Sequence, residues 1–275
     1  MNNQVTATLP LSNPTALPLR SVKEIAQSKV LVVAPHPDDE TLGCGGAIAL
    51  LRFLGCDVRV LVMSDGTLSH PRSQKFPETV LRSLRESETL SALKILGVHA
   101  STVTFLGLKD GSVPILNSPL KSSAVAACRN YLAEIAPQTI FLPWRYDPHP
   151  DHRASWNLIY TALKEMSLSP RLIEYPIWDW DEEQQGTGVG AGEGDRESGS
   201  KFEENSPIPP QVIGWRLDIE TVMELKNSAI AAYASQTTNL IDDDPEGFRL
   251  TPEMLLNFTR PWEVYLEVKT ADSCC

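Results

Sequence analysis

The sequence predicts an α/β fold, a Rossmann-like three-layer sandwich with a mostly parallel sheet. Short apolar runs rich in β-branched residues alternate with longer amphipathic segments between residues 30 and 144, which is the pattern of successive strand–helix–strand units. Polar clusters follow several of these runs, and sites in such sheets form at the carboxyl ends of the strands. With 275 residues, 42% of them hydrophobic, the chain can bury a sizeable core.

The first predicted strand is the apolar run at residues 30–33. A helix opened by glycines is expected over residues 42–54, and a second buried strand over residues 57–63. Two strands joined through a helix run parallel with a right-handed crossover. The later predicted elements are a helix from about 78 to 96, a strand at 102–106, a helix at 122–135, a strand from 139, a helix from about 219 to 234 and a strand near 263–268.

The predicted domain organisation is simple. Residues 1–20 are rich in Pro, Ser, Thr and Asn and are expected to form an irregular leader. One domain is expected over residues 21–270. Within it, a Gly/Glu-rich stretch at about 181–210 is too polar to pack and is predicted to be a flexible insertion.

Charge and composition restrict the partners. A formal net charge of −11 leaves no basic stripe for a phosphate backbone, so no nucleic-acid partner is expected. No segment has the length and apolarity of a membrane span, and residues 1–18 lack the parts of a signal peptide, which predicts no integral membrane segment and a cytoplasmic location. Five cysteines without CxxC spacing fit reduced thiols.

The most informative motif lies at residues 34–40, where a histidine and three consecutive acids follow the first strand. Crowded carboxylates repel one another and are costly to desolvate, so the arrangement predicts a positive group, most simply a metal ion, among them. The other interpretation is a helix N-terminus capped by an acid. Capping needs one acid rather than three, and it does not need His36.

A second cluster, at residues 147–152, follows the apolar run at 139–144 and contains two more histidines. A catalytic zinc site typically has three protein ligands and an open position for water. His36, Asp39 and His152 supply that number of ligands. Asp38 is then left beside the water as the candidate general base.

Two prolines in the second cluster favour a loop, in which one histidine can bind metal and the other can face the substrate. A cationic His149, oriented by Asp151 or another acid, would then stabilise an oxyanion or protonate a leaving amine. A helical spacing of three residues would instead allow His149 and His152 to bind the same ion, which would then have four protein ligands.

These motifs resemble those of the N-acetylglucosaminyl-phosphatidylinositol deacetylase-like family, also called PIG-L or LmbE-like, whose members are zinc-dependent N-deacetylases. The resemblance covers residues 30 to about 267 and rests mainly on segments 35–40 and 149–152. It implies one Zn²⁺ per chain, although another divalent ion would suit the same ligands. The implied roles are His36, Asp39 and His152 as metal ligands, Asp38 as base, His149 as the group that stabilises the tetrahedral intermediate, and Asp151 as the residue that tunes His149.

The same resemblance implies that Arg85 contacts a substrate hydroxyl, although Arg82 is close enough in sequence to take that role. Asp65 and Asp110 follow the second and third strands at the same edge of the sheet, and we expect them to bind substrate. Trp144 and Trp178 are candidates, with Trp180, for a sugar-stacking wall; the other interpretation is that they belong to the core.

The expected function is removal of an N-acetyl group from an amino sugar or an N-acetylglucosamine-type conjugate, giving free amine and acetate. The partner is then a small-molecule amino sugar, and the sequence leaves the oligomeric state open. The alternative is an amidase that acts on a thiol-sugar conjugate or another amide with the same metal site. A nucleotide binder is less favoured, because residues 43–46 lack the G-x-G-x-x-G spacing and follow three acids. A metal-binding protein without catalysis would not need every proposed site residue.

Overall fold

The computed structural model describes residues 11, 13–113, 120–178 and 212–268. Within these residues an eight-stranded sheet has the order β1-β7-β8-β6-β5-β2-β3-β4. The strands are β1 (Leu19–Arg20), β2 (Lys29–Ala34), β3 (Asp57–Ser64), β4 (Val103–Leu108), β5 (Thr139–Pro143), β6 (Arg171–Tyr175), β7 (Val212–Asp218) and β8 (Trp262–Val268). The predicted insertion at 181–210, and Trp180, lie outside the described residues.

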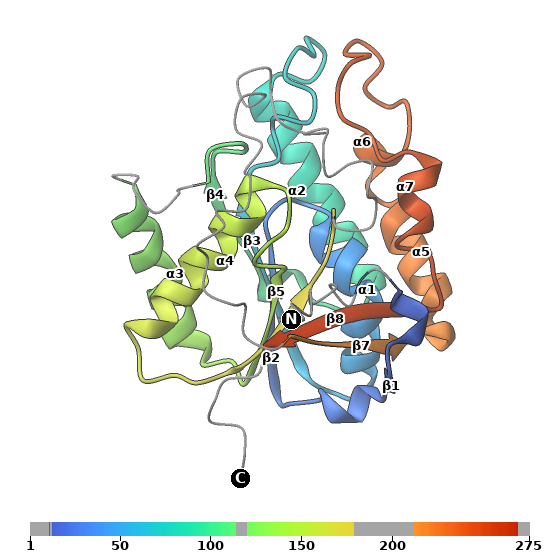
Figure 1. Ribbon diagram of the computed structural model, residues 1–275. Helices are drawn as coiled ribbons and strands as arrows, with labels where there is room; N and C mark the ends of the chain where they lie inside the picture. The colour runs from blue at the N-terminus through green and yellow to red at the C-terminus, as the bar shows by residue number, and fades with distance from the viewer. Residues whose placement is uncertain (1–10, 12, 114–119, 179–211, 269–275) are drawn as a thin grey trace, which may run out of the picture.

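The helices cover both faces of this sheet (Figure 1). They are α1 (Asp39–Phe53), α2 (Glu78–Ile95), α3 (Lys121–Ile135), α4 (Pro150–Lys164), α5 (Met223–Ala231), α6 (Ala234–Thr237) and α7 (Pro252–Leu256), with short 3₁₀ turns at Pro14–Ala16, Val22–Glu24, Ala100–Thr102 and Glu220–Val222. No described helix is both long enough and apolar enough to cross a lipid bilayer.

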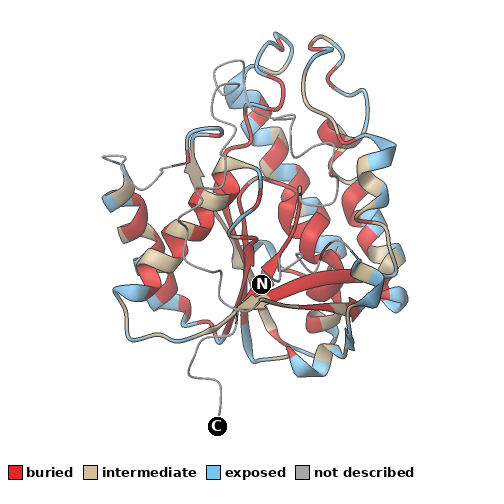
Figure 2. Cartoon of the chain, viewed as in Figure 1, coloured by how far each residue is buried: buried red, intermediate tan, exposed pale blue. Residues whose placement is uncertain are grey.

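Alternating side chains of β2 divide the core into two layers. Val30, Val32 and Ala34 pack with residues of α1, α2 and α5, whereas Leu31 and Val33 pack with residues of α3 and α4. A strand that is apolar on both faces must be covered on both faces, and the central strands are buried accordingly (Figure 2). The predicted α/β three-layer sandwich is confirmed.

The sheet is mixed rather than wholly parallel. Strands β4, β3, β2, β5 and β6 pair in parallel, but β8 is antiparallel to both β6 and β7. Strand β1 pairs in parallel with β7, so the sheet already includes the last two residues of the predicted leader, 1–20.

Two boundaries differ from the sequence prediction in ways that shape the site. Helix α1 begins at Asp39 instead of 42, so the glycines lie in its interior rather than at its opening. Helix α4 begins at Pro150, where a loop was expected over 149–152. Proline is well tolerated at the first helical position, because the missing N–H has no partner there in any case. Asp151 and His152 therefore lie in the first turn of a helix.

Candidate active site

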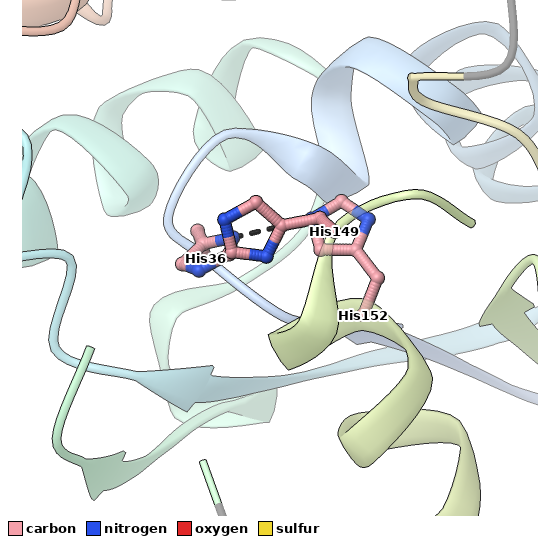
Figure 3. Close-up of side chains that lie close together, drawn as sticks. All are labelled: His36, His149 and His152. Carbon is pink, nitrogen blue, oxygen red and sulfur yellow. Dashed lines mark hydrogen bonds between the residues drawn. The ribbon is translucent and has the colours of Figure 1, made fainter. Parts of the chain in front are cut away.

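The two sequence clusters meet at the carboxyl edge of the sheet. Strand β2 pairs with β5, the first cluster follows β2, and the second runs from the loop after β5 into the first turn of α4. Adjacent parallel strands end at the same edge, which brings together residues more than 110 positions apart, such as His36 and His152. Figure 3 shows the imidazoles of His36, His149 and His152 gathered there.

Three atoms at this edge form a nearly equilateral triangle. His36 Nδ1 lies 3.2 Å from Asp39 Oδ2, and His152 Nε2 lies 3.3 Å from each of these two atoms. A tetrahedral zinc ion at ligand distances of about 2.0–2.1 Å separates neighbouring ligand atoms by about 3.3 Å. The triangle therefore fits one face of a zinc coordination tetrahedron.

The charges around the triangle favour a cation at the same point. Burial lowers the pKa of His152, but the carboxylates of Asp147 and Asp39 outweigh it and raise that pKa to about 9. The pKa of His36 is also raised, because Asp110, Asp151 and Asp39 outweigh its burial. These carboxylates stabilise positive charge, whether it is carried by protons or by a divalent ion.

His149 stands beside the triangle in a different role. It caps the N-terminus of α4, and its Nδ1 accepts a hydrogen bond from the backbone N–H of Asp151 at 3.2 Å. The three histidines could themselves hold an ion, with ligand atoms within 4.8 Å of one another, but this is a looser set than the triangle. With Nδ1 engaged as an acceptor, neutral His149 carries its proton on Nε2.

The structure places the Asp151 carboxylate beside His36, while its expected tuning of His149 stays a prediction. Its Oδ2 lies 3.3 Å from His36 Nε2 and accepts the backbone N–H of Gly111 at 2.7 Å, and its backbone, rather than its carboxylate, contacts His149. The physical reason is the helix: in the first turn of α4 the Asp151 carboxylate points towards His36.

Asp110 also lies against His36, and its expected contact with substrate stays a prediction. Its Oδ1 lies 3.2 Å from His36 Nε2, and its Oδ2 accepts the backbone N–H of Leu68 at 2.8 Å. A carboxylate on the far nitrogen fixes the orientation and tautomer of a metal-binding histidine. Asp110 and Asp151 thus share this orienting contact.

Asp147 is a site residue that the sequence reasoning missed. It is fully buried, its Oδ2 lies 3.3 Å from His152 Nδ1, and its Oδ1 accepts the backbone N–H of His149 at 2.9 Å. Its position at the head of the second acid and histidine cluster was the available signal. It gives His152 the kind of carboxylate support that Asp110 and Asp151 give His36.

Asp38 lies beside the triangle with its carboxylate directed at Arg85. The Asp38 Oδ2 to Arg85 Nη2 distance is 3.0 Å, and both side chains are buried. Burial raises the pKa of Asp38 to about 8, although the Arg85 guanidinium opposes this shift. Such a pKa is suited to a group that takes up and releases a proton near neutral pH.

Arg85 supports Asp38 in this structure, and its expected contact to a substrate hydroxyl stays a prediction. Its Nη2 also donates to the carbonyl of Pro37, and its Nη1 donates to the carbonyl of Gly66 at 3.2 Å. Only 3% of Arg85 is exposed. Arg82, the alternative, is half-exposed and pairs with Glu86 at 2.8 Å.

The side chains of Asp65 and Trp144 make their contacts within the protein. Asp65 Oδ1 accepts hydrogen bonds from the Thr67 hydroxyl at 2.8 Å and from the backbone N–H of Asp110 at 3.1 Å, so it shapes the loop rather than offering a free carboxylate to substrate. Trp144 is fully buried, which excludes it from a sugar-stacking wall. Trp178 is partly buried and packs edge-on against Phe248.

Comparisons with known proteins find deacetylases among the similar chains. The family model described as "PIG-L: GlcNAc-PI de-N-acetylase" matches residues 31–163. The 1D-myo-inositol 2-acetamido-2-deoxy-alpha-D-glucopyranoside deacetylase of Rhodococcus jostii is 26% identical over 251 residues, covering 78% of this chain and 83% of that protein.

Two solved structures share the fold at low identity. The N,N'-diacetylchitobiose deacetylase of Pyrococcus horikoshii is 22% identical, with a TM-score of 0.56, and the match covers 93% of this chain and 85% of that one. GalB, the 4-carboxy-2-hydroxymuconate hydratase of Pseudomonas putida, is 17% identical, with a TM-score of 0.55, over 90% of this chain and 100% of that one. The fold therefore occurs with more than one kind of reaction, and it does not by itself establish the function.

Proposed function

We propose that this chain, whose residues 31–163 match the model of the PIG-L family of de-N-acetylases, removes the N-acetyl group from an N-acetylglucosamine-type conjugate in a zinc-dependent hydrolysis. The observation that carries the proposal is the triangle of His36 Nδ1, Asp39 Oδ2 and His152 Nε2, with its edges of 3.2–3.3 Å, beside the carboxylate of Asp38. The products are a free amine and acetate.

The three atoms of the triangle are the proposed zinc ligands. Two imidazoles and a carboxylate form a donor set that suits zinc and leaves the fourth position open. When bound, the ion supplies Lewis acidity, which polarises the amide carbonyl and acidifies a water molecule. Asp110 and Asp151 hold His36, and Asp147 holds His152, so each imidazole has a carboxylate on its far nitrogen.

The protein's own groups divide the proton transfers. Asp38 takes the proton of the attacking water, and Arg85 fixes its carboxylate for that step. His149 donates a hydrogen bond from Nε2 to the oxygen that becomes negative. Its Nδ1 already accepts the backbone N–H of Asp151, so His149 acts as a neutral donor through Nε2 rather than as the cation expected from the sequence. Asp38 is then the group that returns a proton to the leaving amine.

The substrate proposal comes from the relatives. The Rhodococcus deacetylase is named for an acetamido sugar linked to inositol, and the Pyrococcus enzyme for diacetylchitobiose. Both names contain an N-acetylated glucosamine unit, which we take as the substrate class. The thiol-sugar amidase alternative has no comparable support.

A substrate panel with balanced product measurement tests this function. Zinc-loaded protein is incubated with N-acetylglucosamine, diacetylchitobiose and an N-acetylglucosaminyl inositol, and acetate and free amine are quantified. We expect equal amounts of both products from at least one conjugate, and we expect Asp38→Asn to lower kcat by about 10²–10⁴-fold. Asp57→Asn, which alters a half-exposed carboxylate paired with Arg59, should leave kcat unchanged. An Asp38→Asn variant as active as the wild type would contradict the assignment.

A further inference from the structure

The backbone of Asp38 has a conformation that residues other than glycine rarely adopt. Its φ is 124° and its ψ is −28°, and among described non-glycine residues only Ala136 shares a positive φ. Such a conformation is strained and persists only where its surroundings enforce it. Although Asp38 is the residue before the first turn of α1, its side chain makes no capping hydrogen bond. Its carboxylate is thereby free to face Arg85.

The peptide unit between Pro37 and Asp38 is held from both sides. Arg85 donates to the Pro37 carbonyl, which is one end of this peptide. At the other end, the Asp38 N–H donates to Glu40 Oε2 at 3.2 Å. The orientation of this peptide plane sets φ of Asp38, so the two contacts together fix where its carboxylate points.

Glu40 is itself held by a residue from the far end of the chain. Its side chain is fully buried, and its Oε1 accepts a hydrogen bond from the Thr41 hydroxyl at 2.8 Å and another from the hydroxyl of Tyr233, 193 residues away. Tyr233 is 1% exposed and lies between α5 and α6. A carboxylate with donors on both oxygens cannot rotate without leaving one of them unpaired.

We propose that Tyr233 and Glu40 are positioning residues that hold the Pro37–Asp38 peptide in its strained conformation and so aim the Asp38 carboxylate. The proposal rests on the assignment of Asp38 as the base. It gives Glu40 a task beyond serving the start of α1. Neither side chain needs to touch the substrate.

The first test is Tyr233→Phe, which removes one hydroxyl and keeps the ring. Without its donor, Glu40 Oε1 loses a partner and the hold on the Asp38 N–H loosens. We expect a kcat about tenfold lower, because the base is misplaced by a fraction of an ångström. KM and the amount of bound zinc should not change, because the three ligands are untouched. Hydrogen exchange of the Asp38 amide should become faster, and this readout does not depend on turnover.

Tyr265→Phe is the matched control. Tyr265 is also fully buried, and its hydroxyl donates to the buried carboxylate of Glu263 at 2.7 Å. Glu263 binds the amides of Gly46 and Ala47 in the middle of α1, away from Asp38. The control thus removes the same kind of hydrogen bond from a buried carboxylate of β8 that binds the same helix. We expect a similar fall in melting temperature, with kcat within twofold of the wild type.

A double-mutant cycle with Glu40→Gln completes the experiment. Gln has one acceptor oxygen where Glu40 uses two, so this variant also loosens the hold. If both residues act through this one peptide, kcat of the double variant should be no lower than kcat of the more impaired single variant. The proposal would be overturned if the two single losses in kcat multiplied in the double variant. It would also be overturned if Tyr233→Phe changed neither kcat nor amide exchange, or if Tyr265→Phe lost as much kcat as Tyr233→Phe. An inactive wild type would instead overturn the proposed function, and the amide-exchange comparison would still decide the positioning role.

Discussion

Asp38 and Asp39 are neighbours in sequence, yet their surroundings push their pKa values in opposite directions. Burial raises the pKa of Asp38 to about 8. Burial acts on Asp39 in the same direction, but the adjacent His152 and His36 outweigh it and hold its pKa well below the ordinary value. One carboxylate is suited to carrying a proton and the other to remaining an anionic ligand. This difference between the pKa values of two adjacent acids is the physical basis for assigning them different tasks.

At the residue scale, Asp147→Asn should weaken zinc binding without removing a ligand. The Asn side chain can no longer offer a negative charge to His152 Nδ1, which lies 3.3 Å from Asp147 Oδ2. Loss of such a supporting carboxylate lowers metal affinity by about 10–100-fold. Competition with a chromogenic chelator measures the affinity, and Asp218→Asn, on an exposed residue, is the control. An affinity within twofold of the wild type would remove Asp147 from this role.

His149 can be divided into its two tasks by two substitutions. His149→Asn keeps an acceptor for the Asp151 N–H but lacks the imidazole, so we expect near-normal stability with kcat lowered by about 10²-fold. His149→Ala loses the cap as well and should lower the free energy of unfolding by about 1 kcal/mol more. Urea denaturation and acetate release measure the two effects. Equal stability of both variants would show that the cap contributes nothing.

The residues of the site were predictable in part. His36, Asp39, His152 and Asp38 follow from two short motifs, since few other arrangements need histidines among crowded acids. The partners of Arg85, Asp110 and Asp151 do not follow, because they depend on side-chain directions that sequence spacing leaves open. Asp151 is the clearest example: a loop would let its carboxylate turn to His149, whereas the helix directs it to His36.

At the element scale, the helix that follows β2 shows how packing overrides local signals. Glycine normally disfavours a helix interior by about 1 kcal/mol relative to alanine. In α1, however, a Cβ at Gly43 would lie 2.3 Å from the Tyr175 ring, and one at Gly46 would lie 2.5 Å from Ile219. The glycines allow α1 to approach β6 and the chain before α5 closely. They are contact residues inside the helix rather than its opening, which is why the predicted start at 42 was late.

This packing predicts an order of stability for two alanine substitutions in α1. Gly46→Ala should lower the free energy of unfolding by about 1–3 kcal/mol despite the better helix propensity of alanine, because its Cβ meets the branched side chain of Ile219. Gly45→Ala is the matched control, since its Cβ would lie 3.1 Å from the unbranched chain of Lys226. Urea denaturation should find Gly45→Ala the more stable of the two. The reverse order would contradict the close approach at Gly46.

At the scale of the whole molecule, the segments after residue 163 complete a structure that the matched family region only begins. Lys226 and Glu263 form a buried pair at 2.7 Å, and Glu263 also binds the Gly46 and Ala47 amides of α1. Tyr233 reaches Glu40. The alternation of strands and helices revealed the parallel half of the sheet, but nothing local to 263–268 shows that β8 enters between β6 and β7 in the antiparallel direction. Such placement depends on contacts between segments far apart in sequence.

The carboxylate of Glu267 connects four strands at this antiparallel end of the sheet. It accepts hydrogen bonds from Arg20 of β1 at 2.9 Å, from Arg171 of β6 at 2.8–2.9 Å and from the Trp215 indole of β7 at 2.7 Å. Burial raises its pKa, but the hydrogen bonds and charge of Arg171 and the charge of Arg20 outweigh burial and leave that pKa below the ordinary value. The Glu267 carboxylate therefore binds a proton less readily in the folded state than in the unfolded state.

The lowered pKa of Glu267 predicts how stability depends on pH. A carboxyl whose pKa falls on folding contributes stability that is fully present above its unfolded pKa, about 4.3, and that is lost as pH falls through the folded value. Glu267→Gln cannot titrate, so its deficit relative to the wild type should be constant between pH 7 and about pH 5.5 and should shrink below that. Urea midpoints of both proteins from pH 7 to pH 4 measure the difference, with Glu224→Gln, at an exposed residue, as the control. A deficit that grows on acidification would mean that the arginines do not hold Glu267 ionised in the folded sheet.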